Sequence, residues 1–318
     1  EITPIITNRD VTSPFLVEVQ ESAVKPIEPV FLDYQKDMSQ LKAKSDIPVL
    51  YKQNVANDLF QLIYVFDMGN NHDKALGTAF DYLEYLGTSD MTPEELKSEF
   101  YRLACTFYVS PGNERTYVVL SGLNENMPAA VQLFEKLLAD AQVNKEAYTN
   151  MTSDILKARS DAKLNQGQNF SRLMSFAMYG PKSPATNLLT EAELTNMNPQ
   201  ELVDRIHNQN SYKHRILYYG PSSSKDLLAT INQYHQVPAA LKDIPAGNEY
   251  SYLETPVTKV LVAPYDAKQI YMAQISNLDK KYDPAIEPIR ALYDEYFGGG
   301  MNSIVFQEMR ETRGLAYS

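Results

Sequence analysis

The sequence predicts an α+β fold, with one complete domain followed by the start of a second, similar domain. Segments of helical periodicity alternate with apolar runs rich in aromatic and β-branched residues, and two of these runs form a hairpin pattern. At 318 residues the chain is longer than a domain with a single hydrophobic core usually is. Its composition, with 44% hydrophobic and 22% charged residues, is typical of a globular protein. After a Pro- and Gly-containing stretch at 236–256 the order of elements begins again, which indicates a domain junction.

The elements of the first unit are predicted from capping and turn residues as well as from periodicity. Thr92 can cap a helix in which Pro93 is the first residue and Glu95 completes a capping box. The segment Pro111-Gly112-Asn113 separates the two strands of the hairpin. Strands are predicted at 58–68, 105–110, 115–121 and 215–219. Helices are predicted at 71–86, 93–103, 127–139, 145–164, 170–179, 198–208 and 223–234.

The second unit is shorter than the first. Predicted strands at 259–263 and 269–276 precede helices at 284–297 and 303–312. Two strands and two helices bury little apolar surface, so we expect this unit to be truncated. The predicted division is a linker strap at 1–24, a first domain at 25–237, a linker at 238–256 and a truncated second domain at 257–318.

Composition excludes several classes of protein. The net charge is −11, and no segment concentrates Lys and Arg, so the electrostatic signature of nucleic-acid binding is missing. A single cysteine, Cys105, excludes an internal disulfide framework, and its apolar surroundings predict a buried, inert thiol. No apolar run approaches the roughly 18 residues of a membrane span. The 22 tyrosines predict many amphipathic side chains at surfaces that meet partners or peptide.

The end of the chain carries a specific motif. In residues 297–318, Gly298-Gly299-Gly300 opens a helix that runs to Arg310, and Gly314-Leu315-Ala316-Tyr317 follows it. This run closely resembles a hallmark of the insulinase/pitrilysin (inverzincin) zinc metallopeptidases. The resemblance implies repeated α+β domains, each with a mixed, largely antiparallel sheet backed by helices. In that family two domains form a bowl, and two bowls close around a peptide.

The helix that would carry the catalytic zinc has lost its ligands. The family motif is His-x-x-Glu-His, in which histidines at i and i+4 share a helical face and bind one zinc ion. Here Leu86-Gly87-Thr88 resembles the end of that motif, which places Thr78 and Tyr82 at the histidine positions and Asp81 at the base position. A threonine hydroxyl is a poor neutral ligand, and a tyrosine with a pKa of about 10 is rarely a phenolate. We therefore expect no metal on this chain and zinc on a missing catalytic half.

The four histidines do not replace these ligands. His72, His207, His214 and His235 show no ligand spacing on a single helix, so we interpret them as ordinary surface or core residues. The three glycines at 298–300 are not a phosphate-binding loop, because no Gly-Lys-Ser/Thr follows them. A permissive turn at the entry of a helix accounts for them.

The resemblance implies that Arg310 and Tyr317 bind the substrate backbone near the scissile bond. Without the motif, an ion pair of Arg310 with Glu308 or Glu311 and packing of Tyr317 would explain both residues.

The hypothesis is therefore the C-terminal, non-catalytic, substrate-binding half of a zinc-dependent endopeptidase, inactive alone. Its partners would be a peptide and an N-terminal catalytic half, on the same chain or on another subunit. The alternative is a catalytically dead family member that serves as a structural or assembly subunit. Family resemblance favours the bacterial periplasm over the cytoplasm.

Overall fold

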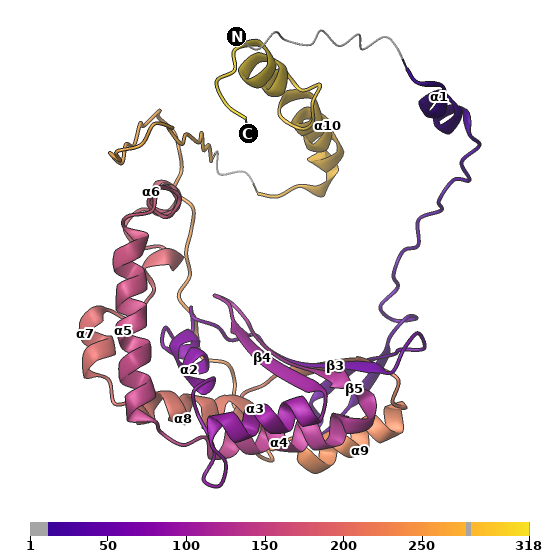
Figure 1. The fold of residues 1–318 in the computed structure, drawn as a ribbon, viewed down its shortest axis with the longest axis vertical. Helices are drawn as coiled ribbons and strands as arrows, with labels where there is room; N and C mark the ends of the chain where they lie inside the picture. Colours follow the sequence, from indigo (N-terminus) through magenta and orange to yellow (C-terminus); the bar gives the residue numbers. More distant parts are fainter. Residues whose placement is uncertain (1–11, 278–280, 318) are drawn as a thin grey trace.

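A six-stranded sheet forms the centre of the molecule in the computed structural model, which describes residues 12–277 and 281–317 (Figure 1). The strand order is β1-β2-β6-β3-β5-β4. Only β2 and β6 pair in parallel, and every other neighbouring pair of strands is antiparallel. The strands are β1 Ser39–Lys42, β2 Pro48–Gln53, β3 Leu59–Phe66, β4 Cys105–Pro111, β5 Thr116–Leu123 and β6 Arg215–Gly220. The mixed, largely antiparallel sheet implied by the resemblance is confirmed.

Helices cover one face of this sheet, and α3, α4, α8 and α9 lie along it in Figure 1. The capping box predicted for α3 is present: Thr92 Oγ1 accepts from the Glu95 amide at 3.2 Å, and Glu95 Oε2 accepts from the Thr92 amide at 2.8 Å. The helices are α1 Pro14–Glu21, α2 Leu76–Leu83, α3 Pro93–Arg102, α4 Met127–Asp140, α5 Lys145–Ala162, α6 Gln166–Tyr179, α7 Glu191–Asn196, α8 Gln200–Asn208, α9 Ser224–Tyr234 and α10 Glu287–Phe297. Of these, α1 and α7 were not predicted.

The two faces of the sheet differ in burial, because side chains alternate along each strand. In β3 the residues Phe60, Leu62 and Tyr64 are buried beneath the helices and form part of the core. The opposite face carries exposed apolar and aromatic side chains, namely Leu59, Tyr108, Tyr117 and Tyr219. This face therefore presents several of the tyrosines to solvent.

The buried thiol and the helix-opening turn agree with the sequence. Cys105 is free and buried, and desolvation raises the pKa of its thiol, which disfavours the reactive thiolate. Gly300 has φ of 79°, the left-handed conformation that glycine adopts without strain.

Several predictions for the ends of the chain were wrong or incomplete. The linker strap at 1–24 contains helix α1, and residues 1–11 lie outside the described residues. The strands predicted at 259–263 and 269–276 do not form, although both segments are described. Val260, Val262 and Ile270 are exposed there, and a strand needs a hydrogen-bonded neighbour that this surface does not supply.

The two helices predicted in the second unit are present, the first as α10 and the second as a segment that is mainly π-helical, η6 (Phe306–Thr312). The division of the chain into domains at the predicted boundaries stays a prediction. Within the described ranges, no helix has both the length and the apolar character needed to cross a bilayer.

Candidate functional site

Helix α2 is the element that would carry the zinc motif. Its start is fixed by Asn70, whose Oδ1 accepts from the Gly77 amide at 2.9 Å. Thr78 and Tyr82 are four residues apart and so share one face of the helix. Thr78 is half-buried and Tyr82 is fully buried, whereas Asp81 is exposed.

Tyr82 is held by the backbone of the residue that caps α5. Its hydroxyl donates to the Asn144 carbonyl oxygen at 2.6 Å and accepts from the Asn144 amide at 2.9 Å. The Asn144 side chain in turn accepts from the Ala147 amide at 3.0 Å and caps the helix. Burial raises the pKa of Tyr82 above its ordinary value, so the phenol stays neutral. Tyr82 therefore fastens α5 to α2 and offers no anionic oxygen to a metal.

The rest of the helix does not form a metal site either. The carboxyl of Asp81 loses part of its hydration to the protein around it, and this, together with the nearby Glu84 carboxylate, raises the pKa of Asp81. Across the described part of the chain, no group of three or more His, Cys, Asp or Glu side chains is arranged so that it could hold a metal ion. The residues at the motif positions thus do not fit a zinc ion, which needs three or four such ligands.

Equilibrium dialysis of the chain against micromolar zinc should show no stoichiometric binding, because α2 supplies a hydroxyl and a bonded phenol instead of imidazoles. Zinc retained after dialysis, measured by atomic absorption, checks this prediction. Thr106→Val on the exposed surface of β4 is a matched control for Thr78→Val. Stoichiometric zinc that Thr78→Val abolishes and Thr106→Val preserves would contradict the assignment.

The structure brings Arg310 and Tyr317 together. The guanidinium carbon of Arg310 lies 4.0 Å from the centroid of the Tyr317 ring and 4.7 Å from that of Phe306. Gly314 has φ of 58°, and this turn carries the chain back along η6, where the Leu315 amide donates to the Met309 carbonyl at 2.8 Å. Tyr317 keeps 80% of its surface exposed.

The ion pair considered as an alternative for Arg310 is also present, because Glu311 lies 3.6 Å away. The carboxylate thus orients the guanidinium from one side while the tyrosine ring covers one face. Figure 1 shows α10 and the turns after it well apart from α2. The structure therefore joins Arg310 to Tyr317, but it does not join this pair to the degenerate zinc motif.

Sequence reasoning missed a buried cluster around two histidines. His214 Nε2 lies 2.8 Å from His235 Nε2, and His235 Nδ1 lies 2.6 Å from Glu135 Oε1. His214 Nδ1 contacts the Tyr212 carbonyl oxygen at 2.7 Å. Desolvation and the neighbouring His235 lower the pKa of His214 to about 4. No spacing in the sequence indicates this cluster, since its members come from three separate elements.

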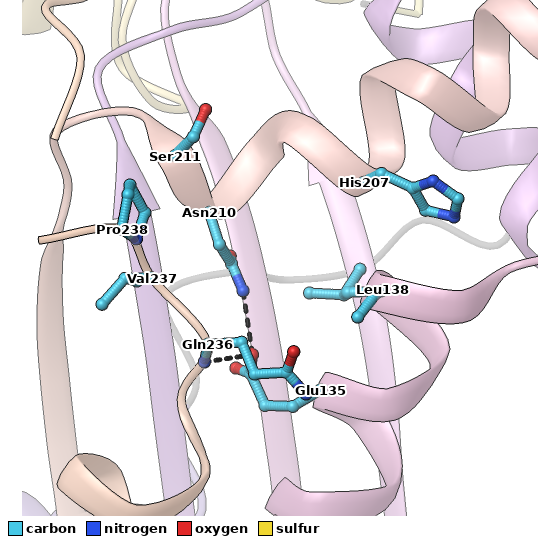
Figure 2. Close-up of a pocket in the computed structure, with 9 residues that line it drawn as sticks. Glu135, Leu138, His207, Asn210, Ser211, Gln236, Val237 and Pro238 are labelled. Carbon is cyan, nitrogen blue, oxygen red and sulfur yellow. Dashed lines mark hydrogen bonds between the residues drawn. The ribbon is translucent and has the colours of Figure 1, made fainter.

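The cluster lies beside a surface pocket of about 310 Å³ (Figure 2). Glu135 Oε2 accepts from Asn210 Nδ2 at 2.9 Å and from the Gln236 amide at 3.0 Å, and Figure 2 draws both bonds. His207 lies on the other side of the pocket, where its Nε2 donates to the Ala141 carbonyl at 3.1 Å. Both oxygens of the buried Glu135 carboxyl are therefore bonded.

Comparison with known proteins shows which sequences and folds this chain is similar to. No family model matches the chain. A curated zinc protease from Rickettsia felis is 20% identical over 263 residues, which cover 78% of this chain and 60% of the relative. The chain thus spans less than two thirds of the length of that relative.

Three solved structures share the fold. The inactive domain of an M16 peptidase from Pseudomonas fluorescens matches with a TM-score of 0.64 at 16% identity, over 88% of this chain and 69% of that one. A protease from Helicobacter pylori matches with a TM-score of 0.62 at 12% identity, over 88% of this chain and 70% of that one. The periplasmic protease PqqL from Escherichia coli matches with a TM-score of 0.60 at 14% identity, over 77% of this chain and 30% of PqqL. The predicted resemblance is confirmed at the level of the fold: this chain has the architecture of the M16 (insulinase/pitrilysin) metallopeptidases, including that of an inactive domain.

Proposed function

We propose that this chain is the non-catalytic, substrate-binding half of a zinc-dependent endopeptidase that hydrolyses peptides inside a closed chamber. The observation that carries the proposal is the contact of the half-buried Arg310 guanidinium with the exposed ring of Tyr317, on a chain whose α2 has a bonded tyrosine in place of a zinc ligand. Tyr317 is exposed beside this cation instead of packed in a core, as a residue that contacts a peptide would be. The catalytic half would be on the same chain or on a partner subunit.

Each group has a role that suits its chemistry. The guanidinium of Arg310 offers fixed, always-charged donors to the carbonyl oxygens of an extended peptide. The Tyr317 hydroxyl adds a donor where negative charge develops during attack on the amide. The exposed tyrosines of the sheet, Tyr108, Tyr117 and Tyr219, would form part of the chamber wall. Zinc on the other half would supply the activated water.

The proposal includes a bacterial periplasmic location, supported by the fold shared with the periplasmic protease PqqL.

Reconstitution tests the proposed function. The zinc-bearing half, recognised by an intact His-x-x-Glu-His, is assayed against internally quenched peptides with and without this chain. We expect little cleavage by either half alone and rapid cleavage by the mixture, because the catalytic centre would be complete only when the two bowls close. A catalytic half without its motif glutamate controls for contaminating proteases. Equal turnover with and without this chain would refute the substrate-binding role and leave the structural alternative.

A further inference from the structure

The three hydrogen bonds of the buried histidine cluster fix how many protons it holds. A carbonyl oxygen only accepts, so His214 Nδ1 must donate to Tyr212 across their 2.7 Å contact. The 2.8 Å contact between the two Nε2 atoms needs one hydrogen, and the 2.6 Å contact between His235 and Glu135 needs another. The cluster therefore holds three hydrogens. Two neutral imidazoles and a carboxylate hold only two, so the intact cluster carries one extra proton and no net charge.

Because the cluster is buried, a change in the number of its protons is energetically costly. His235 and the Glu135 carboxyl are fully buried, and His214 is nearly so. The ring of Tyr64 on β3 lies 4.4 Å from that of His235, and desolvation together with the nearby Glu135 raises the pKa of Tyr64 well above its ordinary value, so it stays neutral. Across the pocket, His207 donates to Ala141. A gain or loss of one proton thus leaves an uncompensated charge where water cannot reach it.

The cluster also holds a segment of the chain in place. His235 follows α9, and the next residue, Gln236, donates its amide to Oε2 of Glu135 on α4, the oxygen that does not contact His235. Val237 and Pro238 then line the pocket beside Glu135. The same segment leads out of the first domain into the predicted linker at 238–256. After α9, the first side chain that holds this segment to the rest of the domain is therefore Glu135.

We propose that Glu135, His214 and His235 form a proton-dependent latch that fastens residues 235–238 to α4, and that the gain or loss of one proton releases this segment. A fourth hydrogen would put N–H groups on both Nε2 atoms, which would then repel each other. Loss of the shared proton would leave two lone pairs facing each other, with a net negative charge on the buried cluster. The latch is closed only with three hydrogens.

The pH at which acid opens the latch can be predicted. The pKa of His214 is lowered to about 4, from 6.5 for a free imidazole. The open or unfolded segment therefore binds a proton more readily than the closed one between these values. As the pH falls from neutral, the stabilisation by the latch begins to weaken near pH 6.5 and is lost towards about pH 4. Arg215, the charged neighbour of His214, is paired with Asp67 at 2.6 Å and leaves the cluster unaffected.

Amide hydrogen exchange of the full chain tests the latch. We expect the Gln236 amide, corrected for its intrinsic rate, to be protected at neutral pH and to lose at least tenfold protection at both acid and alkaline pH. The central strands β3 and β5 should keep their protection over this range. Protection of the Gln236 amide, after correction for the intrinsic rate, that does not change with pH would overturn the proposal. Release of this segment together with β3 and β5 would also overturn it, because that pattern reports unfolding of the whole domain.

Glu135→Gln separates the latch from ordinary packing. Its amide nitrogen can donate to His235 Nδ1 while its oxygen accepts from Asn210 and Gln236, so every hydrogen bond remains with both imidazoles neutral. This variant has no shared proton to lose, and we expect its alkaline release to disappear while acid release persists. His214→Gln should shift acid release to lower pH. His207→Gln, across the pocket, should change neither the acid release nor the alkaline release. A Glu135→Gln variant that keeps the alkaline release of the wild type would refute the proton count.

Discussion

Replacement of Tyr82 by alanine should lower the free energy of unfolding of the domain by about 3–5 kcal/mol, the range found for large buried aromatic residues. The side chain is fully buried, and its hydroxyl bonds both backbone groups of Asn144. Its loss creates a cavity between α2 and α5 and leaves the Asn144 amide without a partner, while the Asn144 carbonyl keeps only the Tyr148 amide. Urea denaturation followed by circular dichroism measures the change.

Two further variants divide this loss into its parts. Tyr82→Phe keeps the ring and removes only the hydroxyl, so we expect a loss of about 1–3 kcal/mol from the unpaired Asn144 amide and the lost bond to its carbonyl. Tyr101 on α3 is 88% exposed, and Tyr101→Ala should stay within about 0.5 kcal/mol of wild type. If Tyr82→Ala were as mild as Tyr101→Ala, Tyr82 would be a vestige of a ligand and not a structural residue.

The double variant Arg310→Ala/Tyr317→Phe should reduce kcat/KM of the reconstituted enzyme by a factor on the order of 10²–10³, the usual cost of removing a donor that meets developing charge. The substitutions delete a guanidinium and a phenolic donor from an exposed surface, so the fold and the zinc content of the other half should not change. Steady-state hydrolysis of an internally quenched peptide gives the ratio.

Matched controls exist within the same unit. Arg313, which lies 3.5 Å from Glu308, and the exposed Tyr296 on α10 are a second arginine and tyrosine outside the proposed pair. Arg313→Ala/Tyr296→Phe should leave turnover unchanged. Since Arg310 stacks on Tyr317, the two single variants should not be additive. Equal activity of the two double variants would remove the assigned role while leaving the proposed partnership of the halves intact.

The sequence predicted elements whose signals are local. The capping box of α3 and the hairpin of β4 and β5 depend on residues within a few positions of each other, and both are present. Strands β1 and β2 were missed because Ser39–Lys42 is short and polar, and because β2 gains its place only by pairing with β6 far along the chain. The apolar pattern at 259–276 predicted strands, but no partner strand pairs with it in the described structure.

In the candidate site, too, contacts between residues far apart in the sequence could not be predicted. Counting back from Leu86-Gly87-Thr88 placed Tyr82 at a ligand position, yet its bond to Asn144 spans 62 residues and has no sequence signal. The buried latch joins residues separated by 21 and by 100 positions, so periodicity cannot reveal it. The contact of Arg310 with Tyr317 was within reach of sequence analysis, because Gly314 between them permits the turn that brings them together.

The position of β6 in the sheet has a consequence for biosynthesis. β6 lies between β2 and β3, yet it follows β2 by about 160 residues, so the ribosome needs roughly 8–30 s to deliver it at 5–20 residues per second. During that interval the nascent chain displays two open strand edges, each a template for unwanted pairing. Holdase chaperones would find their binding site on this protein at those edges, and the vulnerability ends when Arg215–Gly220 leaves the exit tunnel.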